Sequence, residues 1–164
     1  MNARPVAVVT GASRGLGFLL ARELADRGHD LVVNARSESG LATAAVALQE
    51  HGAEVVTVPG DVADPALGQQ LVDTATGRFG RLDVLVTNAG TIQVGPAFAM
   101  RAPDFTNAMD LMFYGVLHPV LAALPVMKER GAGSFPPIEL ITRIRPAPRR
   151  FITGSAASTG CSTP

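Results

Sequence analysis

A glycine-rich stretch, TGASRGLG at residues 10–17, directly follows the apolar run of residues 6–9. A strand that ends here must turn sharply into a helix, and Gly11 permits that turn. Gly15 lets the backbone approach a bound phosphate, while Gly17 lets the new helix pack tightly on the sheet. The unpaired amides that open the helix then attract the anion. This spacing predicts a loop that holds the pyrophosphate of a dinucleotide.

The end of the second predicted strand, VVNARS, bears on which dinucleotide fits. A free ribose 2′-hydroxyl calls for an acidic side chain there, whereas a 2′-phosphate calls for a cation. Ala35 occupies the place of the acid, Arg36 follows, and Asp30 lies at the wrong end of the strand. Arg14 offers a second guanidinium. The pattern favours NADP over NAD; the alternative is that both arginines are ordinary solvated loop residues.

Two further short motifs, GDV at 60–62 and NAG at 88–90, follow the third and fourth predicted strands. Asp61 and Asn88 could each be a simple turn former. Because the carboxyl ends of parallel strands share one edge of a sheet, both motifs should lie beside the glycine loop. There they are expected to contact adenine and ribose.

Short Val-rich runs alternate with segments of helical periodicity along the first half of the chain. We expect strands over residues 6–9, 31–33, 54–58 and 82–86, and helices over residues 15–27, 37–51 and 64–79. Glycines 28, 52 and 80 follow these helices, and Asp64 with Pro65 is a favourable helix start. This alternation predicts an α/β fold with right-handed crossovers and a parallel sheet covered on both faces.

One long, mostly helical segment is predicted over residues 103–130. Pro119 and Pro125 should bend or interrupt it, because proline lacks the amide hydrogen that a helix interior needs. Its apolar residues favour core packing or a subunit interface over a role in ligand binding.

Taken together, the motifs TGASRGLG, NAR, GDV and TNAG resemble those of the short-chain dehydrogenase/reductase family over about residues 5–134. The resemblance implies a Rossmann-like, doubly wound parallel sheet in three α/β/α layers, here incomplete at its C-terminal edge, and possible homo-oligomers through helix 103–130. It also implies a set of NADP-binding residues: Gly11, Ser13, Arg14, Gly15, Leu16, Gly17, Arg36, Asp61, Val62, Asn88, Ala89 and Gly90.

Members of this family transfer a hydride between a nicotinamide and a carbonyl or alcohol. They use a tyrosine as acid/base, a lysine four residues later, a serine and usually an asparagine. The only tyrosine of this chain is Tyr114 and its only lysine is Lys128, so no Tyr-x-x-x-Lys motif occurs. Met112 occupies the place of the asparagine.

The composition changes after Ser134, where the chain becomes rich in proline and arginine and ends in a Ser/Thr/Gly/Ala-rich stretch. We therefore expect a Rossmann-like domain over residues 1–134 and an irregular tail over 135–164. Either IELIT or RFIT could form the strand that delivers the family serine. The second would make Ser155 the catalytic serine, although Ser155 could equally be one of several serines in a loose tail.

A frameshift near Ser134 is one hypothesis for this change of composition. If RFIT is the serine strand, the family tyrosine would fall just beyond Pro164. The hypothesis predicts that another reading frame of the gene encodes Tyr-x-x-x-Lys, and it fails if none does.

The remaining composition argues against several other classes of protein. With 47% hydrophobic residues, the chain is expected to form one domain with a buried core. Because the net charge is zero, no affinity for nucleic acid is expected. One cysteine and three scattered histidines predict neither a disulfide nor a metal site. No apolar stretch suggests a signal peptide or a membrane helix, which makes a cytoplasmic location the expectation.

Three hypotheses about function remain open at this point. The chain could be an NADP-dependent oxidoreductase of impaired activity, acting on an unidentified carbonyl or alcohol. It could instead be a non-catalytic NADP-binding module, or a non-functional truncated product that folds poorly.

Overall fold

The computed structural model describes residues 4–91 and 95–134, which form a parallel sheet flanked by helices. The four strands lie in the order β3-β2-β1-β4 and every pairing between them is parallel. This is the predicted Rossmann-like α/β arrangement. The strands are β1 (Val6–Thr10), β2 (Asp30–Ala35), β3 (Val55–Pro59) and β4 (Val84–Val86). The α-helices are α1 (Gly15–Asp26), α2 (Glu38–Gln49), α3 (Pro65–Phe79), α4 (Ala102–Met109) and α5 (Gly115–Glu129).

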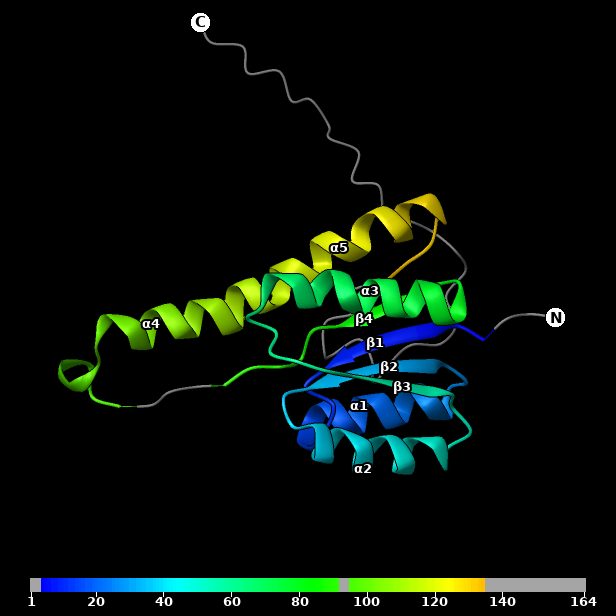
Figure 1. Ribbon diagram of the computed structural model, residues 1–164, viewed down its shortest axis with the longest axis horizontal. Coiled ribbons are helices and arrows are strands. Elements are labelled where there is room, and N and C mark those ends of the chain that lie inside the picture. Colours follow the sequence, from blue (N-terminus) through cyan, green and yellow to red (C-terminus); the bar gives the residue numbers. More distant parts are fainter. Residues whose placement is uncertain (1–3, 92–94, 135–164) are drawn as a thin grey trace, which may run out of the picture.

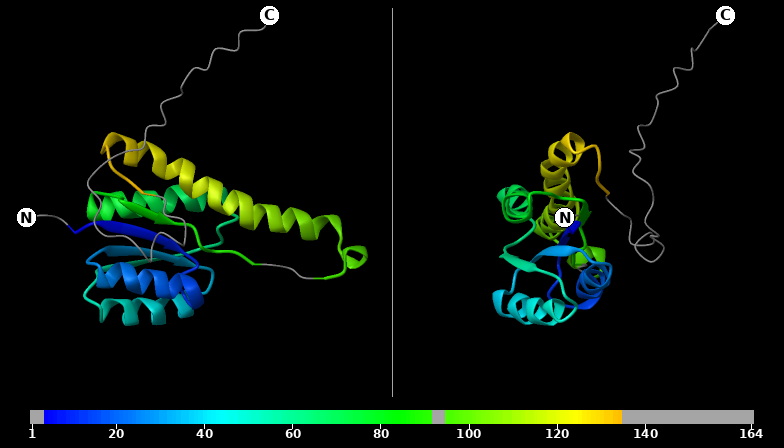
Figure 2. Two further views of the ribbon diagram at one scale, coloured as in Figure 1. Left: turned by 180° about the vertical axis from the view of Figure 1, so that it is seen from behind. Right: turned by 90° about the vertical axis from the view of Figure 1, so that its right-hand side faces the viewer.

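Helices cover both faces of this sheet, as Figures 1 and 2 show. Helices α1 and α2 lie on one face, and α3 and α5 on the other. Two apolar clusters fill the space between the layers because alternate residues of each strand point to opposite faces. Val9 and Leu31 belong to the cluster under α1 and α2, while Val8 and Val32 belong to the cluster under α3 and α5.

Local sequence explains where these helices begin and end. Ser37 accepts a hydrogen bond from the Gly40 amide at 3.1 Å and so caps α2. Asp64 caps α3 in the same way, and Pro65 is the first residue of that helix. Gly80 ends α3 with a φ of 72°, a left-handed conformation that suits glycine. The predicted boundaries are thereby confirmed to within a few residues.

The predicted effect of the two prolines in the long helical segment is corrected in part. Pro119 and Pro125 both lie inside α5, and neither interrupts it. The helix departs from α geometry only earlier, in a π-helical turn at Asp110–Tyr114 between α4 and α5. Pro119 is buried against α3, where a Cβ added to Gly68 would lie 2.8 Å from its nitrogen. Pro119 thus lies at the contact between α3 and α5.

This long helix also meets the length and composition of a membrane span. Residues Ala102–Glu129 include an 18-residue window of mean hydropathy 1.5, of which 17% is buried. It is the one such helix among the described residues. Its second half, α5, packs against α3 and contributes the buried residues Ala123 and Met127 to the core. That half is therefore part of the sheet domain.

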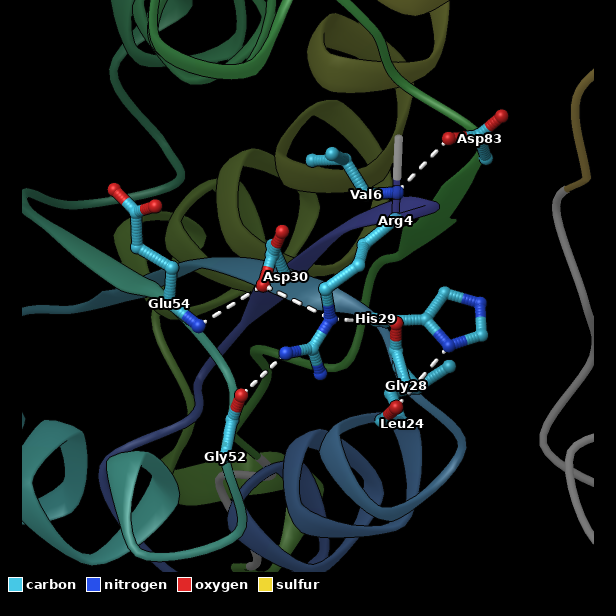
Figure 3. A network of polar contacts seen from close by, with 9 residues as sticks. All are labelled: Arg4, Val6, Leu24, Gly28, His29, Asp30, Gly52, Glu54 and Asp83. Atoms are coloured by element: carbon cyan, nitrogen blue, oxygen red, sulfur yellow. Dashed lines mark hydrogen bonds and ion pairs between the residues drawn. The ribbon is translucent and has the colours of Figure 1, made fainter. Parts of the chain in front are cut away.

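A network of polar contacts closes the amino-terminal end of the sheet (Figure 3). The Asp83 carboxylate accepts a 2.8 Å hydrogen bond from the Val6 amide and so ties the loop before β4 to the start of β1. Asp30 accepts one at 2.9 Å from the Glu54 amide and so ties β2 to β3. Arg4 pairs with Asp30 and donates to the carbonyls that follow α1 and α2. These contacts lie at the end of the sheet opposite the carboxyl ends of the strands.

Beyond β4, the sheet begins a further parallel connection. Ser134 forms a bridge with Val84: its amide donates to the Asp83 carbonyl at 2.8 Å, and its carbonyl accepts from the Leu85 amide at 3.1 Å. The two candidate strands IELIT and RFIT, the expected tail and Ser155 lie outside the described residues.

Candidate functional site

A cavity of about 640 Å³ opens at the carboxyl ends of the strands. Four loops meet there: the glycine loop after β1 and the loops after β2, β3 and β4. Its lining comprises Gly11, Ser13, Arg14, Gly15, Asn34, Ala35, Arg36, Ser37, Gly40, Gly60, Asp61, Val62, Asn88, Ala89, Gly90 and Leu111. This is the edge at which a Rossmann-like sheet binds its ligand.

The glycine loop leaves room above the start of α1. Gly15 has a φ of 60°, and a Cβ added there would meet no other atom within 4 Å. No side chain caps α1, because Arg14 at the N-cap makes no capping hydrogen bond. The amides of the first turn are therefore available to an anion, and their dipole favours one. The open side of Gly15 is a cradle that a side chain would fill.

The two predicted phosphate-binding arginines lie on the same cavity. Arg14 and Arg36 are exposed, and neither side chain forms a hydrogen bond or ion pair with another described residue. Ala35, where an acid would oppose a 2′-phosphate, is buried. Two guanidinium groups without a carboxylate partner give this end of the cavity a positive charge.

The loop after β3 forms another wall of the cavity. Asp61 is exposed, and its carboxylate accepts a 3.0 Å hydrogen bond from the Ala63 amide, which holds the loop in a turn. Val62 is buried beneath the start of α5, where a Cβ added to Gly115 would lie 2.9 Å from Val62 Cγ2. Contact with α5 consequently fixes the backbone of this loop, while Asp61 lines the cavity.

The loop after β4 is tied directly to the glycine loop. Thr10 Oγ1 accepts hydrogen bonds from the Asn88 amide at 3.0 Å and from the Ala89 amide at 3.1 Å. Asn88 Nδ2 donates to the carbonyls of Thr10 and Gly11 at 3.2 and 3.4 Å. Asn88 thus joins two loops of the site and has a structural role besides lining the cavity.

The structure brings ten of the twelve predicted cofactor residues together on the cavity. Of the other two, Leu16 is 46% exposed outside the lining, and Gly17 is buried beneath the loop. Six lining residues were not in the predicted cofactor set: Asn34, Ala35, Ser37, Gly40, Gly60 and Leu111. Asn34 carried a signal, because it is polar within an otherwise apolar strand. Leu111 carried none, because its place depends on the path of a distant helix.

The only tyrosine and the only lysine do not meet at this site. Tyr114 stacks on His118 with ring centroids 5.6 Å apart, and neither residue lines the cavity. Lys128 lies in the last turn of α5. Met112, at the place of the family asparagine, is 49% exposed. The described residues therefore assemble a nucleotide-sized cavity without a Tyr-Lys pair beside it.

Comparisons with known proteins agree with this geometry. Residues 5–135 match the family model for short chain dehydrogenase. The chain is 38% identical over 137 residues to 1-deoxy-11-beta-hydroxypentalenate dehydrogenase of Streptomyces avermitilis, covering 82% of this chain and 51% of that protein.

Solved structures add a second comparison. An actinorhodin polyketide ketoreductase variant with NADPH superposes with a TM-score of 0.77 at 34% identity, covering 80% of this chain and 51% of that one. A short chain dehydrogenase/reductase from Burkholderia phymatum in complex with NAD has a TM-score of 0.77 at 34% identity, covering 80% and 47%. The chain spans about half the length of these proteins. With the glycine loop, the parallel sheet and the matched residues in agreement, the chain belongs to the short-chain dehydrogenase/reductase family of oxidoreductases.

Proposed function

We propose that this chain binds a nicotinamide dinucleotide in the cavity at the carboxyl ends of the strands, and that it prefers NADP(H) to NAD(H). The observation that carries the proposal is the pair Arg14 and Arg36, exposed on the cavity and without an acidic partner among the described residues. A 2′-phosphate offers these guanidinium groups a charge that a ribose hydroxyl lacks.

The individual residues fit such a ligand. The amides that open α1 and the open side of Gly15 would accept the pyrophosphate, and Asp61 and Val62 would face the adenine. Asn88, Ala89 and Gly90 would lie along the ribose and nicotinamide side. The related structures were solved one with NADPH and one with NAD, so the preference for NADP rests on the residues of this chain.

The bound nicotinamide would supply or accept a hydride, as in an oxidoreductase acting on a carbonyl or alcohol. Proton transfer to the substrate oxygen needs an acid/base group. Residues 1–164 contain no Tyr-x-x-x-Lys, and Tyr114 lies away from the cavity. We therefore expect these residues to bind cofactor with little turnover. A non-catalytic NADP-binding module is the second candidate, favoured by the same observation.

Fluorescence titration of the purified chain with NADPH and with NADH tests the binding proposal. Saturable binding with a preference for NADPH is expected, and a chain that ignores both coenzymes at millimolar concentration would overturn it. Oxidation of NADPH with a panel of ketones then separates the two candidates, because only the oxidoreductase consumes cofactor.

We also propose that two copies associate through the helix Ala102–Glu129. Large apolar side chains lie exposed along it: Phe105, Met109, Met112, Phe113, Leu121 and Leu124. Burying them in a dimer would remove apolar surface from water. Analytical ultracentrifugation tests this, with Leu121→Asp expected to shift the chain toward monomer. Cell fractionation tests the accompanying proposal of a cytoplasmic location, which a membrane-bound pool would contradict.

A further inference from the structure

Two polar side chains are buried in the apolar sheet among the described residues, Thr10 and Asn34, each 1% exposed. They are register partners at the carboxyl ends of β1 and β2. Thr10 accepts hydrogen bonds from the loop after β4. Asn34 reaches in the other direction, toward β3.

The Asn34 side chain holds the loop after β3. Its Nδ2 donates to the Val58 carbonyl at 2.9 Å and to the Gly60 carbonyl at 3.1 Å. Gly60 immediately precedes Asp61, so the second hydrogen bond fixes the start of the loop that carries Asp61 and Val62, which we call the adenine-side wall. The Asn34 backbone carbonyl also accepts a 2.9 Å hydrogen bond from the Ala12 amide in the glycine loop. One residue therefore contacts both walls of the cavity.

This arrangement leaves the amide oxygen of Asn34 without a partner. Both groups that Nδ2 meets are carbonyls, which accept and cannot donate, so the amide has only one workable orientation. Oδ1 is then buried without a hydrogen bond. A buried polar atom of this kind lowers stability. The rest of β2 after Asp30 is apolar, and a valine at position 34 would continue the strand pattern and remove the unpaired oxygen.

We propose that Asn34 is a positioning residue of the dinucleotide site. It keeps the Gly60–Asp61 backbone at a set distance from the glycine loop, so that the adenine-side wall is already in place when the cofactor arrives. The side chain holds this loop through two hydrogen bonds at the cost of one unpaired buried oxygen, and we place the benefit in cofactor binding. The inference rests on the proposed binding of NADP(H) and deepens it.

The test compares Asn34→Val and Asn34→Ser with Val32→Ala. Val32 lies two residues earlier on the same strand and is fully buried. Its side chain is apolar and cannot hydrogen-bond to either loop, so Val32→Ala is a matched control for damage to the core. Three quantities are measured for each chain: the melting temperature, the affinities for NADPH and for 2′,5′-ADP, and hydrogen exchange at the Gly60 amide. That amide donates to the Ala35 carbonyl at 3.1 Å and reports directly on the loop.

Asn34→Val removes one unpaired oxygen but takes a donor from two carbonyls, so it is expected to lower the melting temperature no more than Val32→Ala does. It should bind NADPH and 2′,5′-ADP roughly tenfold more weakly and exchange faster at Gly60. Asn34→Ser retains one donor and should recover part of the affinity. Val32→Ala should melt earlier yet bind both ligands normally.

The inference is overturned if Asn34→Val binds like the unchanged chain, or if Val32→Ala loses as much affinity. If the unchanged chain binds neither ligand, the proposed function fails instead. Exchange at Gly60 then still decides whether Asn34 holds the loop, because that measurement needs no ligand.

Discussion

The carbonyl oxygen of Gly11 lies so close to Gly17 that a Cβ added to Gly17 would stand 2.3 Å from it. The same Cβ would stand 2.4 Å from Asn88 Nδ2. Gly15, two residues earlier, has no atom within 4 Å of its added Cβ. The two glycines of one motif therefore have different roles. Gly17 permits close packing of α1 against the glycine loop and Asn88, and Gly15 leaves space for a phosphate.

Alanine at these two positions should separate stability from binding. Gly17→Ala forces the loop off the helix and should lower the free energy of unfolding by about 3 kcal/mol or more. Gly15→Ala should lower it by roughly 1–2 kcal/mol, because of its positive φ alone, while largely abolishing NADPH binding. Urea unfolding and NADPH titration of both variants give the comparison. Equal stability losses would contradict the assignment.

Removing a single guanidinium should change cofactor preference. Arg36→Ala is expected to weaken NADPH binding about tenfold or more and to leave NADH binding nearly unchanged, because only NADPH carries the 2′-phosphate. Arg22→Ala provides the control, since Arg22 is an exposed arginine of α1 outside the cavity lining. The two affinities can be measured by fluorescence titration at fixed salt. A parallel loss for NADPH and NADH would instead place Arg36 at a shared part of the ligand.

Close contact between α3 and α5 depends on Gly68. A Cβ there would lie 2.7 Å from the His118 carbonyl carbon, which is backbone and cannot swing aside. Gly68→Ala should therefore push the helices apart and destabilise the domain by about 1–3 kcal/mol. Gly77→Ala on the same helix meets nothing within 4 Å and should be neutral or stabilising by about 0.5–1 kcal/mol. Thermal unfolding of both variants measures the difference in their stability. Equal stability of the two variants would contradict close contact between α3 and α5.

Asp83 should make stability depend on pH in the acid range. Burial by itself raises the pKa of Asp83, but hydrogen bonds from Arg81 and the Val6 amide, with the charges of Arg81 and Arg130, outweigh it and hold the pKa below its usual value. Because the folded-state pKa is the lower one, this stabilisation is complete above the unfolded-state pKa. It is lost as the pH falls below about 4 and through the folded-state value.

Asp83→Asn tests this relationship. The variant should be less stable than the unchanged chain at pH 7 and should lose less further stability on acidification, as measured by urea unfolding between pH 7 and pH 3. An unchanged slope below pH 4 would show that other carboxylates dominate the acid response. Asp73→Asn is a suitable control, because Asp73 is an exposed residue of α3 outside this network.

Much of the fold followed from local pattern. Buried parallel strands need continuous apolar runs, and helices between them need caps and terminal glycines, so β1 to β3 and α1 to α3 could be placed within a few residues. The glycine loop, Arg36, Asp61 and Asn88 were predictable for a related reason. Each follows a strand end, and parallel topology brings strand ends to one edge.

Other features depended on contacts between distant segments. Proline inside a helix is locally unfavourable, yet Pro119 remains within α5 because its buried face packs against Gly68 of α3. Leu111 reaches the cavity because a π-helical turn and the packing of α5 over Val62 set the path of the long helix. The hydrogen bonds of Asn34 to Val58 and Gly60 join residues 24 and 26 positions apart. Local pattern carries no information about such neighbours, because only the packed chain brings them within reach.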